Sequence, residues 1–108
     1  MNKKKLVKLG EYLELVRSQY NDFQSAYLFG SYVRGQQTSE SDVDLAIVFA
    51  ELKDEDRFER QVQLMILASA FDSRIEPHPF SREDFDSENP FAFEIRKTGT
   101  EIEIVDQS

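Results

Sequence analysis

Two aspartates stand at the head of an apolar segment, Asp42-Val-Asp-Leu-Ala-Ile-Val-Phe49. The unbroken apolar run that follows them predicts a buried β-strand. Because residues i and i+2 of a strand point to the same face, the carboxylates of Asp42 and Asp44 project side by side. Adjacent carboxylates repel each other unless a cation lies between them, and Asp44 has no structural reason to stand inside an apolar strand. The segment therefore predicts a divalent-cation site at a strand start, and oxygen ligands of this kind suit Mg²⁺.

A second feature, a strand-to-helix turn, precedes the aspartates. Residues 25–29 are short, apolar and aromatic, which predicts a buried strand, and Gly30-Ser31 follows directly. Glycine lets the backbone approach a ligand closely, and Ser31 can cap a short helix over 32–35 whose free N–H groups suit a phosphate. Alone, this pair would be only a turn and a helix cap. With the two aspartates downstream, it is a candidate phosphate site.

A third acid, Glu76, stands on a predicted strand over residues 73–80. It can join the aspartates if its strand lies beside theirs, but an acid at a strand edge is often merely solvated. Pro77 and Pro79 confine this strand to a sheet edge or end it early. His78, between the two prolines, is expected to have a surface or structural role. Arg34 either contacts phosphate or pairs with a surface acid.

Helices and strands alternate along the whole chain. One helix is expected over 3–20, a second after the N-cap Asp54, one helical turn after Ser81, and a last helix over 90–98 between Asn89 and Gly99. Strands are expected over 25–29, 42–49, 73–80 and 101–105. The expected buried stripes are Leu6, Leu9, Leu13, Val16 and Tyr20 on the first long helix, Phe58, Val62, Met65, Ile66 and Ala70 on the second, and Phe91, Phe93 and Ile95 near the end. This order predicts a layered sheet with helices on it.

Composition narrows the possible functions. A chain of 108 residues suffices for one domain, 1–108, and the lack of cysteine excludes disulfides, thiolate metal sites and thiol catalysis. The sequence holds neither a membrane-length apolar run of ~18 residues nor a signal peptide, so a cytoplasmic protein is expected. A net charge of −8 repels nucleic acid, so no direct nucleic-acid contact is expected.

Together these segments resemble the DNA polymerase β-like nucleotidyltransferase superfamily, and more narrowly its minimal nucleotidyltransferases. The resemblance rests on Leu28-Phe-Gly-Ser-Tyr-Val-Arg-Gly35, on Ser41-Asp-Val-Asp-Leu45 and on the later Glu76. It implies an α+β fold, a small mixed β-sheet with flanking helices. It also implies that Asp42, Asp44 and Glu76 are catalytic and bind a pair of Mg²⁺ ions, and that Gly30, Ser31 and Arg34 bind the nucleotide. Glu76 replaces the commoner aspartate, and its extra methylene alters the expected geometry.

The resemblance further implies transfer of AMP from ATP to a protein hydroxyl, with tyrosine as the expected acceptor. Such proteins often pair with a HEPN-domain toxin and act as its antitoxin. Because the chain carries no appended substrate-binding domain, recognition must come from a partner, a homo-oligomer or a large acceptor. One alternative is a non-catalytic antitoxin that neutralises its partner by occlusion. Another is transfer to a small molecule such as an aminoglycoside, against which the lack of a second domain argues.

Overall fold

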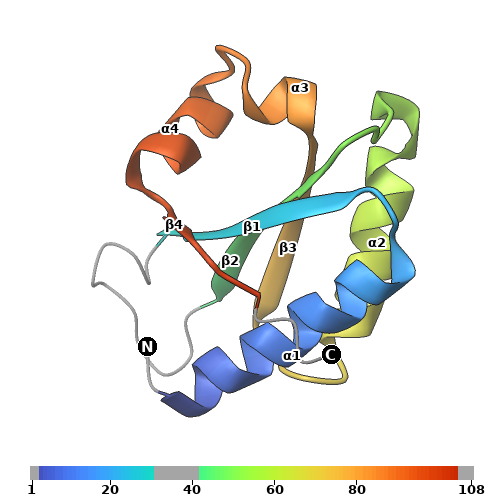
Figure 1. Cartoon of the computed structure of the whole chain (residues 1–108), viewed down its shortest axis with the longest axis vertical. Coiled ribbons are helices and arrows are strands. Elements are labelled where there is room, and N and C mark those ends of the chain that lie inside the picture. The colour runs from blue at the N-terminus through green and yellow to red at the C-terminus, as the bar shows by residue number, and fades with distance from the viewer. Residues whose placement is uncertain (1–2, 31–41, 105–108) are drawn as a thin grey trace.

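The computed structural model describes residues 3–30 and 42–104 (Figure 1). The elements are α1 (Lys3–Gln19), β1 (Phe23–Phe29), β2 (Val43–Phe49), the short 3₁₀ helix η2 (Asp54–Asp56), α2 (Arg57–Ala68), β3 (Ile75–Ser81), α3 (Arg82–Phe85), α4 (Pro90–Thr98) and β4 (Thr100–Glu101). The expected α+β class and the small mixed sheet are confirmed. None of the described helices is long and apolar enough to cross a membrane.

The four described strands form one sheet in the order β3-β2-β1-β4. β1 is antiparallel to both β2 and β4, whereas β2 and β3 are parallel. The parallel pair is connected through α2, the crossover that such a pair requires. β2 has β1 on one side and β3 on the other, and all its residues except Asp44 are buried. This explains why its sequence is almost continuously apolar.

The two prolines of β3 lie at the edge of the sheet, as predicted. Pro77 pairs with Leu45 of β2, and Pro79 with Ile47. The carbonyl of Pro77 faces away from β2 and accepts a hydrogen bond from the Gln61 side chain of α2, 3.1 Å long. The proline nitrogens therefore lie on the side of the strand where no neighbouring strand needs a donor.

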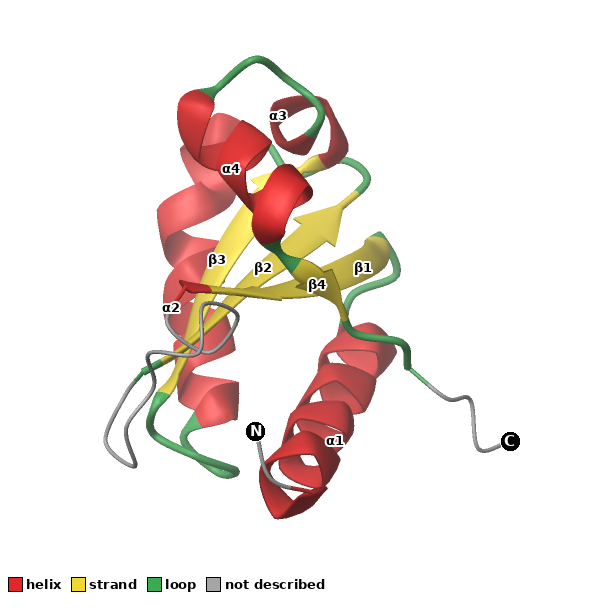
Figure 2. Ribbon diagram, turned by 90° about the vertical axis from the view of Figure 1, so that its left-hand side faces the viewer, coloured by secondary structure: helices red, strands yellow, loops and turns green. Residues whose placement is uncertain are grey.

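Helices cover both faces of the sheet (Figure 2). α1 and α2 enclose a core against one face, and α3 and α4 pack on the other face around Ala46 and Val48 of β2. α1 is tied to α2 by Tyr12, whose hydroxyl donates to the carbonyl of Leu64 at 2.9 Å. Burial raises the pKa of Tyr12, so this phenol remains a donor at ordinary pH. One residue of the expected α1 stripe, Leu6, is exposed.

The predicted buried face of α2 is wrong. Leu64 and Ala68 are buried, whereas the expected residues Phe58, Val62, Met65, Ile66 and Ala70 are exposed. The inner face begins with Arg60 and Gln61, which are polar but have partners in the fold. Arg60 places its guanidinium over the Phe49 ring, 4.5 Å from the centroid, and Gln61 bonds to β3. Because polar residues occupy the first inward turn, apolar spacing alone selects the opposite face.

Three smaller predictions also differ from the structure. Asp54 is not the cap of α2; it begins η2, and its carboxylate accepts from Arg57 at 3.0 Å. In α4 only Ile95 of the three expected core residues is buried, and Phe91 and Phe93 are about half exposed. β4 is only two residues long, Thr100–Glu101, and pairs with Leu28 and Tyr27 of β1. The expected caps Ser81, Asn89 and Gly99 are confirmed.

The turn between α2 and β3 is fixed by one carboxylate. Asp72 accepts from the backbone N–H of Arg74 at 3.0 Å and from its guanidinium at 2.9 Å. The carbonyl of Arg74 in turn accepts from the backbone N–H of Val43 at 2.7 Å. The hydrogen bonds from Arg74 hold the pKa of Asp72 below its usual value. The start of β2 is thereby anchored to this turn.

The two faces of α2 provide a first prediction. Leu64→Ala removes a fully buried side chain and should lower the free energy of unfolding by about 2–5 kcal/mol. Phe58→Ser, on the exposed face of the same helix, should change it by less than about 0.5 kcal/mol, since serine and phenylalanine have similar helix propensities. Urea denaturation of both variants provides the comparison. A larger loss from Phe58→Ser would show that the outer face is buried in the protein.

Asp72 provides a pH-dependent prediction. Because its pKa is lowered in the folded state, its contribution to stability is present above the unfolded pKa and is lost as pH falls through the folded pKa. Asp72→Asn should therefore cost about 1 kcal/mol at pH 7, and the difference from the parent protein should shrink as the pH falls below 3.8, the ordinary pKa of an aspartate. Denaturant titrations across that range test it, and a pH-independent difference would contradict it.

Candidate metal and nucleotide site

The candidate site lies where three residues on neighbouring strands pair side by side across the sheet. Phe29, the last residue of β1, pairs with Asp44 of β2, and Asp44 pairs with Glu76 of β3. Ala46 and Val48 belong to the core beneath α3 and α4, so by strand alternation Asp44 points to that face as well. The parallel register thus places Asp44 and Glu76 next to each other, which is the condition for Glu76 to join a metal site with Asp44.

Asp44, Glu76 and His78 form one cluster of possible metal ligands. Each offers a ligand atom, and these atoms lie within 4.8 Å of one another. Nε2 of His78 is 3.4 Å from Oδ1 of Asp44 and 3.9 Å from Oε1 of Glu76. All three side chains are partly exposed, so an ion has access to them. Two carboxylates and an imidazole are a donor set that divalent cations accept, so these residues fit the metal that the family implies.

His78 is the functional candidate that sequence reasoning missed. It was expected to be a surface or structural residue, yet it faces both carboxylates. Its ring is also held by aromatic neighbours, with centroids 5.3 Å from Phe29 and 5.9 Å from Phe91 in edge-to-face contacts. The available signal was its position two residues after Glu76 on a strand, which places both side chains on one face.

Gly30 lies against the same cluster. Its φ is +80°, a conformation that residues with a side chain rarely adopt. A Cβ added at this position would collide with the carboxylate of Asp44. Glycine is therefore needed here for two reasons, the turn and the close passage of the backbone beside Asp44. That Gly30 also binds the nucleotide stays a prediction.

The other predicted site residues are not gathered in this way. Asp42 precedes β2, is exposed, and does not belong to the group formed by Asp44, Glu76 and His78. Its side chain is therefore not brought together with the other two acids. Ser31, Arg34 and the short helix expected over 32–35 lie outside the described residues. Their roles in nucleotide binding stay predictions.

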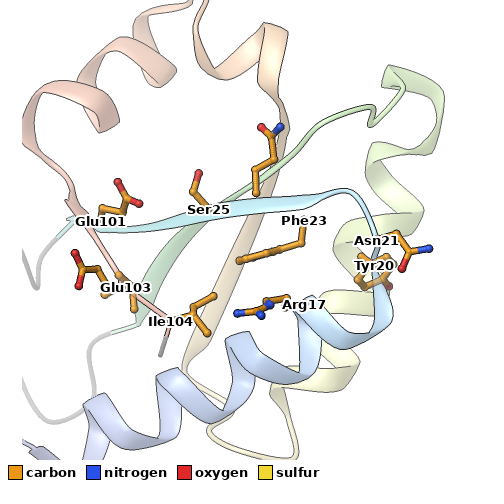
Figure 3. A pocket seen from close by; sticks show the side chains of 10 residues that line it. Arg17, Tyr20, Asn21, Phe23, Ser25, Glu101, Glu103 and Ile104 are labelled. Atoms are coloured by element: carbon orange, nitrogen blue, oxygen red, sulfur yellow. The ribbon is translucent and has the colours of Figure 1, made fainter. Parts of the chain in front are cut away.

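A separate hollow of about 650 Å³ lies between the end of α1, the start of β1 and the chain after β4 (Figure 3). Its polar lining includes Arg17 of α1 and Glu101 and Glu103 near the C-terminal end of the described chain. It contains none of the predicted site residues. It is thus distinct from the carboxylate cluster.

Comparison with known proteins identifies the class to which this fold and site belong. The family model for polymerase beta nucleotidyltransferases matches residues 11–107, which is nearly the whole chain. The chain belongs to this family. No curated protein sequence matches it.

Solved structures resemble the chain over most of its length. A toxin–antitoxin structure with AMP-PNP matches with a TM-score of 0.61 at 24% identity, covering 98% of this chain and 77% of the matched chain. A structure of the tri-AMPylated HEPN toxin of Shewanella oneidensis in complex with an MNT antitoxin matches with a TM-score of 0.58 at 22% identity, covering 94% and 73%. The crystal structure of a putative nucleotidyltransferase from Sulfolobus solfataricus matches at 30% identity with a TM-score of 0.50, covering 70% of this chain and 64% of the matched chain. These likenesses confirm the expected polymerase β-like fold.

Gly10 and Gly30 provide a matched prediction. Gly30→Ala should lower the free energy of unfolding by more than about 1 kcal/mol, because alanine is strained at this φ and its Cβ collides with Asp44. Gly10→Ala, in the interior of α1 with open space around the added Cβ, should raise it by about 0.5–1 kcal/mol. Thermal and urea unfolding measure both. A neutral Gly30→Ala would contradict the contact with Asp44.

Proposed function

We propose that the chain is a divalent-metal-dependent nucleotidyltransferase that moves AMP from ATP to a hydroxyl of a protein partner. We propose further that it is the antitoxin of a HEPN toxin–antitoxin pair, with a tyrosine of the toxin as acceptor. The observation that carries the proposal is the pairing of Asp44 with Glu76 across β2 and β3, in a chain of this family. Related folds crystallised with AMP-PNP, and with an AMPylated HEPN toxin, support the nucleotide and the partner.

The reaction exchanges one bond at phosphorus for another. The acceptor oxygen bonds to the α-phosphorus of ATP, the bond from that phosphorus to pyrophosphate breaks, and the hydroxyl proton passes to solvent. Bound Mg²⁺ supplies positive charge that favours the ionised acceptor oxygen and the pyrophosphate leaving group. Asp44 and Glu76 would hold that charge at the starts of their strands. We assign Asp42 to the same task, for which its exposed side chain must turn toward them.

Other residues position the nucleotide in this proposal. Gly30 lets the chain pass beside Asp44 without a side chain between them, so the phosphates can lie against the backbone. Ser31 and Arg34 are proposed to contact the phosphates. Because such chemistry depends mainly on positioning and charge neutralisation, the adjacent starts of β2 and β3 are a sufficient scaffold.

Two further readings make different predictions. An occluding antitoxin neutralises its partner by covering it and needs no transfer. A transferase that acts on a small molecule labels that acceptor and leaves the partner unlabelled.

The test uses α-labelled ATP, Mg²⁺, the purified protein and the product of the neighbouring gene. Asp44→Asn should lower labelling of the partner by at least about a hundredfold while leaving the fold intact, because it removes one carboxylate that holds the metal. Glu11→Gln, an exposed acid of α1 on the other face of the sheet, should label the partner like the parent protein. Circular dichroism of each variant checks the fold.

Protection of cells from the partner separates the remaining alternatives. If Asp44→Asn labels nothing but still protects, the protein neutralises by occlusion. If the parent protein labels neither the partner nor a small molecule, the transferase proposal is wrong.

A further inference from the structure

The structure points to His78 as a direct metal ligand, and we infer that it makes the site prefer Mn²⁺ and similar transition-metal ions over Mg²⁺. The inference rests on the proposed metal site and refines which cation it takes. The resemblance to the family led us to expect carboxylate ligands alone. An imidazole nitrogen is a different donor, and it changes the chemistry of the cluster.

The first step concerns how His78 reaches the carboxylates. It stands on β3 opposite Ala46 of β2, two pairs beyond Asp44 and Glu76 and on the same face of the sheet. Alanine is small, so the imidazole has room to lean across β2 toward Asp44. The result is an Nε2 atom 3.4 Å from one carboxylate and 3.9 Å from the other. All three donors thus converge on one volume.

The second step concerns how firmly the imidazole is held. Phe29 and Phe91 contact its ring edge-to-face, and Phe91 also contacts Phe80, whose ring centroid is 5.7 Å away. The residues before and after His78 are prolines, whose φ angles are fixed. The side chain is therefore oriented by its neighbours and by its own backbone before any ion arrives. Such preorganisation lowers the entropic cost of binding.

The third step is donor chemistry. Mg²⁺ favours oxygen donors and keeps its waters, whereas imidazole suits transition-metal ions. With Asp42 outside the cluster, the three gathered donors are two carboxylates and one nitrogen. A set of this composition gains more from Mn²⁺, Co²⁺ or Zn²⁺ than from Mg²⁺. The nitrogen is thus the feature of the site that discriminates between ions.

The test measures metal binding without ATP and without a partner, so it stands or falls separately from the transferase proposal. Mn²⁺ is titrated into the untagged protein at pH 8 and followed by electron paramagnetic resonance, with Mg²⁺ as competitor. His78 is the sole histidine of the chain, so coupling of Mn²⁺ to an imidazole nitrogen is assigned without ambiguity. We expect that coupling in the parent protein.

Two variants separate ligation from packing. His78→Phe keeps an aromatic ring between Phe29 and Phe91 but removes the nitrogen. It should abolish the coupling and raise the Kd for Mn²⁺ at least about tenfold, while the Kd for Mg²⁺ changes less than about twofold. Phe91→Leu removes a ring contact and should retain the coupling. Asp44→Asn should weaken the binding of both Mn²⁺ and Mg²⁺.

Three results would overturn the inference. One is the absence of nitrogen coupling in the parent protein. Another is a Kd for Mn²⁺ that stays the same in His78→Phe. The third is an equal loss of Mn²⁺ and Mg²⁺ affinity in that variant, which would make His78 a positioning residue that orients Asp44. Thermal unfolding of each variant confirms that a change in affinity does not come from a lost fold.

Discussion

The parallel pairing of β2 with β3 is the constraint on which the rest of this structure depends. It sets Asp44 beside Glu76, and the antiparallel pairing of β1 brings Phe29 and then Gly30 to the same place. A slip of one residue would turn each side chain to the opposite face of the sheet. It would then move the acids toward the core of α1 and α2 and expose Leu45 instead. Burial of β2 on both faces makes such a slip costly, so the core fixes the geometry of the site.

Much of this fold follows from local chemistry. The three longer strands, the caps at Ser81 and Asn89 and the edge position of β3 depend on residues close in sequence, and these predictions are confirmed. The buried face of α2 depends instead on distant partners. Arg60 and Gln61 are turned inward because Phe49 and β3 offer them contacts, and no pattern within the helix shows those contacts. The apolar residues on the other side then remain exposed despite a spacing typical of a core.

The same distinction applies to the site. That Asp44 is out of place in an apolar strand could be seen from its neighbours in sequence. That Glu76 lies beside Asp44 follows only from the order of the strands within the sheet. The order of helices and strands along the chain does not determine it. His78 was missed because a lone histidine between prolines resembles a surface residue until Ala46 is known to lie opposite. Asp42 was expected beside Asp44 by strand alternation, but it precedes β2, where the ladder no longer fixes the direction of its side chain.

The position of the cluster also links stability to ligand binding. Asp44 and Glu76 lie where the buried strands reach the end of the core, partly exposed and close enough to repel each other. Gly30 adds no side chain there, and the rings of Phe29 and Phe91 contact His78 edge-to-face. On the proposed metal site, a bound cation would relieve this repulsion only in the folded state, because the unfolded chain does not hold these residues together. Its binding would then stabilise the register of β2 and β3, the same register that brings the ligands together.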